Sequence, residues 1–321
     1  MTSASTSPPS QQATKARAAV PAAPLPGTSD RPSSTGHPRP PRGGWRSGTG
    51  RGVIYVVLGA ISIPFCFPLY WLLIGVFKNP SAMQHIPPIW FQAHWVLSNF
   101  RHLFATQGGN LLRYTANTLY ISLFTVAATL LASSLAAFGF SQYDFRGRDT
   151  LFWTVIILLI LPPWATIVPQ YQLFSWLHWI GGSKPLTLPY LFGDPFTVFL
   201  LRQYMRSIPR EYSESARVDG ASEFRIWWSI MMPMVRPALW VAGVFAFITS
   251  YNNFFAPLIY LTKPSSYTLA LGAYQFVQLH GTPDIAEIVA YTALVVLPLI
   301  VLFAFAQRRI IAGVRLGSGL R

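Results

Sequence analysis

Residues 202–233 read RQYMRSIPREYSESARVDGASEFRIWWSIMMP, a charged segment between two apolar stretches. Pro209 suits the first turn of a helix, and Gly220 can adopt the left-handed backbone that ends one. Ser222 can cap a second helix with Glu223 in its first turn, where a negative charge is favoured. The segment therefore predicts two short helices joined at Gly220.

The two sides of this segment differ in polarity. Ile226, Ile230 and Met231 fall at helical spacing, and we expect them to face the membrane surface or the rest of the protein. The charged residues on the opposite rim, predicted to face the cytoplasm, are Arg210, Glu214, Arg217 and Asp219. Many amphipathic loops share this pattern, so it does not by itself define a function.

Apolar stretches continue on both sides of the segment. Of the 321 residues, 52% are hydrophobic and only 11% are charged, whereas soluble domains carry about a quarter charged residues. A helix needs about 20 apolar residues to cross a bilayer core. The stretches that meet this requirement are residues 53–76, 116–140, 151–173, 186–204, 237–260 and 287–307. The sequence therefore predicts an all-α membrane protein with six transmembrane helices.

Helix-breaking residues interrupt the third and fourth stretches. The third carries Pro162, Pro163 and Pro169, and the fourth carries Asp194 followed by Pro195. We predict that both are kinked or broken, which a membrane tolerates only where protein or a water-filled cavity satisfies the freed backbone groups. Asp194 before a proline is typical of an N-cap. We favour this structural role over that of a buried functional carboxylate.

The distribution of Lys and Arg predicts the orientation. With the N-terminus in the cytoplasm, 19 of the 24 basic residues lie on the cytoplasmic side and 5 on the other. Because cytoplasmic loops are enriched in Lys and Arg, we predict that both termini are cytoplasmic, with residues 77–115, 174–185 and 261–286 outside. The same bias explains the formal net charge of +14, so we do not predict nucleic-acid binding.

Residues 1–51 have a different composition from the rest of the chain. They are rich in Pro, Ser, Ala, Gly and Arg and have almost no large apolar residues, which predicts a disordered, basic cytoplasmic tail. Residues 39–51 could contact anionic lipid headgroups, but we favour a solvated linker. The apolar run that follows is long enough to span, so we do not interpret the tail as a cleavable signal peptide. Residues 52–321 form the predicted transmembrane domain.

Patterns of known catalytic and metal sites are absent. Residues 181–185, GGSKP, lack the spacing of a phosphate-binding loop, so we expect no ATP hydrolysis by this chain and no catalytic residue. Cys66 is the one cysteine, and His85, His94 and His102 match no usual ligand spacing. We therefore predict neither a metal nor a cofactor.

Four of the six stretches contain no Asp, Glu, Lys or Arg; these are residues 53–76, 116–140, 151–173 and 237–260. Proton-coupled carriers place ionisable side chains within the membrane, so we expect the energy for transport to come from a partner. A stand-alone channel or ion-coupled carrier with a carbonyl-lined Na⁺ site stays open as an alternative. A membrane anchor without a transport role is a further one.

The spacing within residues 202–233 resembles the EAA loop of binding-protein-dependent ABC importer permeases, E-A-A-x3-G-x9-I-x-L-P. The matching residues are Glu214, Ser215, Ala216, Gly220, Ile230, Met232 and Pro233. Ser replaces the middle Ala, and Met replaces Leu. Residues 199–204, 251–258 and 307–308 are similar to MalG-type sugar permeases, and the resemblance covers about residues 50–321. At the family's Asn-[Asp/Glu] position this chain has Asn252-Asn253, which lacks the acidic side chain.

The resemblance implies a sugar import permease of the plasma (inner) membrane that works by alternating access. Its implied partners are a second, homologous permease subunit, two copies of an ATPase subunit and an extracytoplasmic solute-binding protein. The implied substrate is a sugar, an oligosaccharide or a related polyol phosphate. The loop would be the coupling helix that docks into the ATPase. Its implied coupling residues are Glu214, Ser215, Ala216, Asp219, Gly220 and Pro233.

Polar residues in the broken stretches are candidates for the substrate pathway. Gln170 and Tyr171 follow Pro169, and Asn252 and Asn253 lie shortly before Pro257. Helices that open at such points can line a cavity. These side chains could equally form hydrogen bonds between helices, and the sequence does not separate the two roles.

Overall fold

The computed structural model describes residues 48–83, 85, 90, 95–279 and 285–318. Most of the predicted tail, residues 1–47, lies outside the described residues. The chain divides into a unit that ends at Ala60 and a unit that begins at Ile61. The described part of the first unit is the first half of helix α1 (Gly48–Gly75).

The described residues form helices joined by turns and loops, with no strand among them. After α1 the α-helices are α2 (Pro80–Met83), α3 (Ser98–Gln142), α4 (Arg148–Ile160), α5 (Pro163–Trp176), α6 (Lys184–Thr187), α7 (Pro195–Arg206), α8 (Glu211–Val218), α9 (Glu223–Arg225), α10 (Met232–Met234), α11 (Arg236–Tyr251), α12 (Phe255–Tyr260), α13 (Leu269–Leu279) and α14 (Ile285–Ser318). The 3₁₀ helices are η1 (Leu188–Phe192) and η3 (Pro264–Ser266), and η2 (Ile226–Met231) is a π-helix. The predicted all-α class is confirmed.

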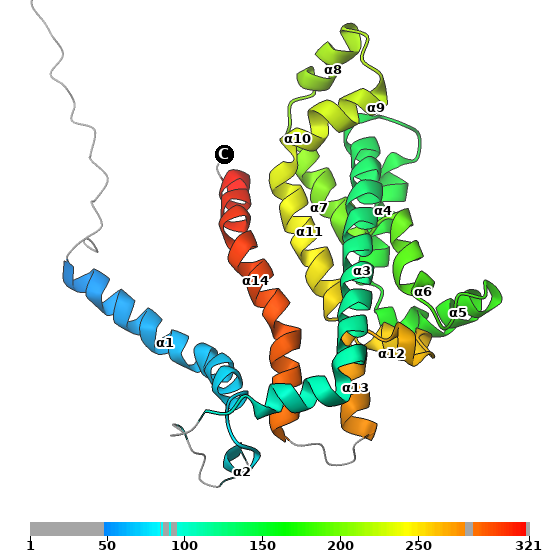
Figure 1. Ribbon diagram of the computed structural model, residues 1–321. Helices are drawn as coiled ribbons and strands as arrows, with labels where there is room; N and C mark the ends of the chain where they lie inside the picture. The colour runs from blue at the N-terminus through cyan, green and yellow to red at the C-terminus, as the bar shows by residue number, and fades with distance from the viewer. Residues whose placement is uncertain (1–47, 84, 86–89, 91–94, 280–284, 319–321) are drawn as a thin grey trace, which may run out of the picture. The chain divides into compact units, whose positions relative to one another are not determined.

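Helix α3 is the longest described helix of the second unit. It has 45 residues, which corresponds to about 68 Å along its axis. Its first turns point in a different direction from its main part (Figure 1). Residues 98–115, predicted as loop, are therefore helical. One face of α3 carries a buried row of small hydroxyl residues, Thr118, Ser122, Thr125, Thr129 and Ser133. Such residues let a neighbouring backbone approach closely, and α3 packs against α7, α11 and η1.

The two predicted breaks are confirmed. Between α4 and α5 the chain bends by 101° at Leu161 and Pro162, where Leu161 is extended because a proline follows it. The fourth stretch, residues 186–204, is divided into α6, η1 and α7. Asp194 caps α7 as predicted, since its carboxylate accepts a hydrogen bond of 2.8 Å from the Thr197 amide.

Judged by length and composition, fewer helices could span a membrane than the sequence predicts. Among the described residues three helices could cross a membrane, Gly52–Gly75, Gln107–Gln142 and Ile285–Gln307. There are up to five when two bent helix pairs are each taken as one span. The stretch at 186–204 is not among them, because no part of it is a long continuous helix. Six spans stay a prediction.

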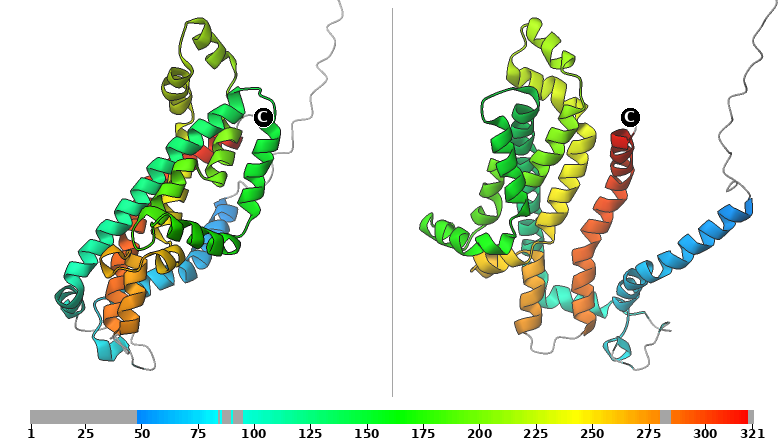
Figure 2. Two further views of the ribbon diagram at one scale, coloured as in Figure 1. Left: turned by 90° about the vertical axis from the view of Figure 1, so that its right-hand side faces the viewer. Right: turned by 180° about the vertical axis from the view of Figure 1, so that it is seen from behind.

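Helices α8 to α10 project from one end of the helical body, and α12 and α13 lie toward the opposite end (Figures 1 and 2). A hydrophobic core joins the projecting segment to α3, α7 and α11. Its fully buried members include Leu201, Met205, Ile226, Met231 and Val235. The projecting segment is thereby packed against the ends of α3, α7 and α11.

Candidate functional site

The segment predicted as two helices joined at a glycine has that form. Helix α8 begins at Glu211, two residues after Pro209. Gly220 has a φ of 79°, and Ser222 caps the helical stretch that follows by accepting from the Arg225 amide at 3.4 Å. The second helix differs from the prediction in one respect, since its middle part, η2, is a π-helix. Within it Ile226 and Met231 face the protein core.

Side-chain contacts fix α8 to the end of α3. The Ser213 hydroxyl, 1% exposed, donates to Gln142 Oε1 at 2.6 Å. Arg210 donates to Asp144 at 3.0 Å, and its guanidinium holds the pKa of the Asp144 carboxyl below its usual value. A buried hydrogen bond and an ion pair thus join the α8 segment to the C-terminal end of α3.

The outer face of α8 is open. Glu214 and Ser215 are exposed, and so are Asp219 and Gly220 at the turn and Pro233 in α10. Ala216 differs from these predicted coupling residues because it is half-buried against the core. The same helix exposes 53% of Tyr212 and 88% of Val218. These two exposed apolar side chains were not predicted, and their signal in the sequence is their place on a helix that is otherwise charged.

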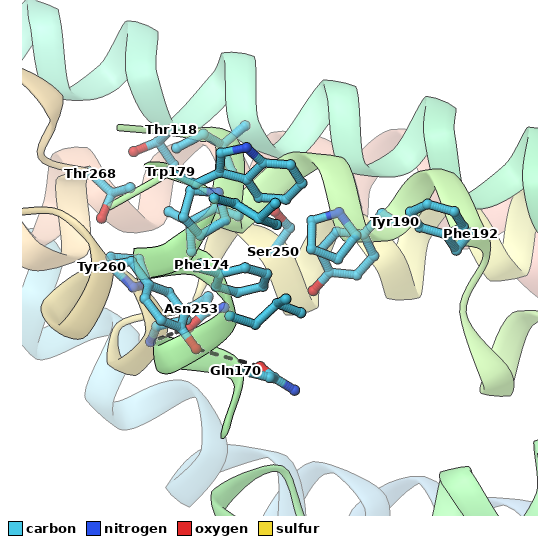
Figure 3. Close-up of a pocket in the computed structure, with 18 residues that line it drawn as sticks. Thr118, Gln170, Phe174, Trp179, Tyr190, Phe192, Ser250, Asn253, Tyr260 and Thr268 are labelled. Carbon is cyan, nitrogen blue, oxygen red and sulfur yellow. Dashed lines mark hydrogen bonds between the residues drawn. The ribbon is translucent and has the colours of Figure 1, made fainter. Parts of the chain in front are cut away.

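The second feature is a cavity of about 560 Å³ toward the other end of the body. Side chains from α3, α5, α6, η1, α11, α12 and the segments that connect these helices line it; they include Thr118, Gln170, Phe174, Trp179, Tyr190, Phe192, Ser250, Asn253, Tyr260 and Thr268 (Figure 3). The lining includes η1, which interrupts the fourth predicted stretch, the part of α5 from Gln170 onward, and residues on both sides of the junction of α11 and α12. That this cavity is a substrate pathway stays a prediction.

Aromatic rings form one wall of this cavity. The Phe174 ring stacks on Trp179 with 5.6 Å between centroids and meets Tyr260 edge-on at 5.3 Å. The Tyr260 hydroxyl donates to Gln170 Oε1 at 3.4 Å (Figure 3). An apolar lining with a few fixed polar groups is typical of a small-molecule site.

The four predicted pathway residues divide into two pairs. Gln170 and Asn253 line the cavity, and Asn253 also accepts from the Ala256 amide at 3.2 Å, which caps the first turn of α12. Tyr171 and Asn252 do not line it. Tyr171 stacks on Tyr260 with 6.3 Å between centroids, and Asn252 is an exposed residue at the C-terminal end of α11. The aromatic wall was missed, since its members come from separate segments without a shared sequence pattern.

The structure combines three features: apolar helices long enough to span a membrane, a projecting amphipathic helix bound to the longest of them, and a cavity between broken helices. Together they define a multi-pass membrane transport subunit. Residues 128–316 match the family model described as binding-protein-dependent transport system inner membrane component. Two relatives are from Bacillus subtilis. The arabinooligosaccharide permease AraQ is 31% identical, and the match covers 80% of this chain and 92% of AraQ. The maltodextrin permease MdxG is 30% identical, and the match covers 82% of this chain and 94% of MdxG. A solved bacterial ABC transporter for the import of alginate is similar in fold, with a TM-score of 0.72 at 18% identity over 82% of this chain and 98% of that one.

The chain belongs to the family of binding-protein-dependent transport system inner membrane components. It is the permease subunit of an ABC importer and not an enzyme. In this family ATP hydrolysis belongs to a separate subunit.

Proposed function

We propose that this permease imports a saccharide and that α8 couples its movement to a separate ATPase. The observation that carries the proposal is the course of α3. This helix lines the cavity with Thr118 and Ile121, and its last residue, Gln142, holds α8 through Ser213. One rigid element therefore links the candidate docking helix to the candidate binding site.

The lining of the cavity supports a saccharide as the substrate. Sugar rings present apolar C–H faces, which pack on aromatic rings, and hydroxyl groups, which pair with amide and hydroxyl side chains. Trp179, Phe174 and Tyr260 supply the rings, and Gln170 and Asn253 supply the amides. The names of the relatives, which refer to arabinooligosaccharides and maltodextrin, point to the same class.

The assembly we propose contains a second, homologous permease, two copies of an ATPase subunit and an extracytoplasmic solute-binding protein. The exposed face of α8, with Glu214 and Ser215 flanked by Tyr212 and Val218, is the surface for the ATPase. Apolar area with charged groups beside it is common in protein interfaces. Asp219, Gly220 and Pro233 would set the orientation of this face, and Ala216 would anchor it to the core.

The membrane arrangement we propose has six spans in residues 52–321, with both termini in the cytoplasm. Contacts between loops support it. Asp144 and Arg210, in two loops assigned to the cytoplasm, form an ion pair at 3.0 Å. At the other end the Gly181 amide donates to the Tyr260 carbonyl at 2.8 Å, which joins a segment assigned to the outside to the end of the fifth predicted span that borders an outside loop.

Replacement of the cavity's tryptophan tests the saccharide proposal. The complete complex would be reconstituted in vesicles and supplied with labelled arabino-, malto- and galacto-oligosaccharides. Loss of an aromatic contact of about 1–2 kcal/mol predicts that Trp179→Leu lowers kcat/KM for uptake by about five- to thirtyfold. The matched control is Trp176→Leu, because Trp176 is 73% exposed and does not line the cavity. Equal uptake by both variants would contradict a binding role for this cavity.

A further inference from the structure

A second cavity of about 370 Å³ adjoins the aromatic one, and Tyr190 and Ser250 line both. We call it the inner chamber. Its polar lining residues are Thr125, Thr129, Tyr190, Asp194, Thr197, Thr249 and Ser250, and Phe196, Phe245 and Ala246 complete it. Apolar atoms supply most of the surface of both cavities, but seven of the ten residues that line the inner chamber carry a hydroxyl or carboxyl group.

The inner chamber lies closer to α8 than the aromatic cavity does. Along α3 the aromatic cavity is lined by Thr118 and Ile121 and the inner chamber by Thr125 and Thr129, and α3 continues from there to its contact with α8 at Gln142. Thr118 and Thr129 are separated by about 16 Å along the helix axis. A solute that moves from the aromatic cavity toward the α8 end meets the inner chamber next.

Polar atoms without a partner line this chamber. Thr129 is 1% exposed, and its hydroxyl forms no hydrogen bond with the described residues. A buried hydroxyl without a partner costs free energy. Asp194 Oδ2 accepts from both the amide and the hydroxyl of Thr197, each at 2.8 Å. Its Oδ1 accepts no hydrogen bond from the described part of the chain, and no Lys or Arg there forms an ion pair with it. Capping of α7 thus accounts for one carboxylate oxygen and leaves the other available.

We propose that the inner chamber is a second saccharide-binding station and that Asp194 restricts it to neutral saccharides. This inference rests on the proposed import of a saccharide. A carboxylate oxygen accepts hydrogen bonds from sugar hydroxyls, and the Thr129 hydroxyl can complete the contact. An acidic sugar would bring a like charge next to Asp194, which is strongly unfavourable in a partly desolvated site. The fold alone does not set this preference, since a protein of the same fold imports the acidic polysaccharide alginate.

Photo-crosslinking in the complete complex tests the position of the second station. Phe192 lines only the aromatic cavity and Phe196 only the inner chamber, so each would be replaced separately by p-benzoylphenylalanine. The probe is a mixture of tritiated arabinotriose, maltotriose and galactotriose, applied during ATP turnover. Label at both positions is the expected result. Label at position 192 alone would overturn the second station and leave the proposed function intact, and label at neither would overturn both.

Competition at position 196 tests the role of the charge. In the parent protein an excess of unlabelled galactotriose should remove the label, and trigalacturonic acid should be at least about tenfold less effective. Asp194→Asn retains an N-cap acceptor. In this variant the two competitors should remove the label with an effectiveness that agrees within about threefold. Equal competition in the parent protein, or an unchanged preference in the variant, would overturn the assignment of Asp194.

The contribution of Thr129 is tested in the same assay. Thr129→Val keeps the side-chain shape and removes the hydroxyl, so it should lower the label at position 196 by about threefold or more and leave the label at position 192 unchanged. Thr292→Val is the control, because the exposed Thr292 hydroxyl bonds only to the Ile288 carbonyl of its own helix. An equal loss of label at both positions would show that Thr129 has a structural role.

Discussion

Gly220 joins α8 to the helical stretch that follows, and its backbone conformation limits which residues this position can hold. Its φ is 79°, and a Cβ added there would meet no atom within 4 Å. Gly220→Val therefore has a backbone cost alone, at least about 1–2 kcal/mol for a β-branched residue at positive φ. We expect this variant to insert in the membrane but to lose transport. Gly220→Asn should keep most uptake, since Asn adopts this conformation readily. Equal uptake by both variants would show that the turn conformation is unimportant.

Glu214 is the residue of α8 that we expect to contact the ATPase. It is exposed and forms no ion pair with the described residues. Loss of one member of a desolvated charge pair costs about 2–5 kcal/mol, so Glu214→Ala should impair ATPase recruitment or substrate-stimulated ATP hydrolysis. The thermal stability of the permease should not change. Glu211→Ala is the matched control, because Glu211 is exposed on the same helix and lies outside the motif. A normal rate of stimulated hydrolysis in Glu214→Ala would contradict the coupling role.

At the scale of elements, the contact between α3 and α8 is the path of coupling that we propose. Ser213→Ala removes a buried hydrogen bond of 2.6 Å and leaves Gln142 without that donor, at a cost of about 1–3 kcal/mol. We expect substrate to stimulate ATP hydrolysis less in this variant, while basal hydrolysis persists. Ser207→Ala is the control, since the exposed Ser207 hydroxyl bonds only to the nearby Tyr204 carbonyl. Unchanged stimulation in Ser213→Ala would indicate that coupling uses another contact.

The elements that the sequence predicted correctly are those with local causes. Proline explains the break before α5, and Asp194 and Gly220 determine a cap and a turn through their own side chain or lack of one. The π-helix η2 and the helical start of α3 depend on packing between distant segments, so propensity and periodicity do not indicate them. The same distinction separates the lining residues of the cavity that could be predicted from those that could not. Gln170 and Asn253 were found because they lie beside prolines, whereas Trp179 and Tyr260 become neighbours only in the folded protein.

At the scale of the whole molecule, contacts bring together loops that the distribution of basic residues assigns to the same side of the membrane. Besides the Asp144–Arg210 pair, Asn117 near the start of the second predicted span donates to the carbonyls of Ser265 and Tyr267 at 2.9 and 3.0 Å. Each end of the helical body thus collects loops assigned to one side of the membrane. This grouping indicates which loops share a side, and the excess of Lys and Arg then assigns the α8 end to the cytoplasm.

Cysteine labelling of intact cells tests this assignment. The native Cys66 is an exposed free thiol, so Cys66→Ser must first remove it. A cysteine at Gly109, which is exposed and has open space around it, should react with a membrane-impermeant maleimide from outside. Thr150→Cys is the inside position; it is preferable to Gly147, whose φ of 88° would be strained by any side chain. The cysteine at position 150 should react only after the cells are opened. Reaction of position 150 in intact cells, with position 109 protected, would reverse the orientation. It would also place α8 on the side opposite to the ATPase, so the coupling proposal would fail with it.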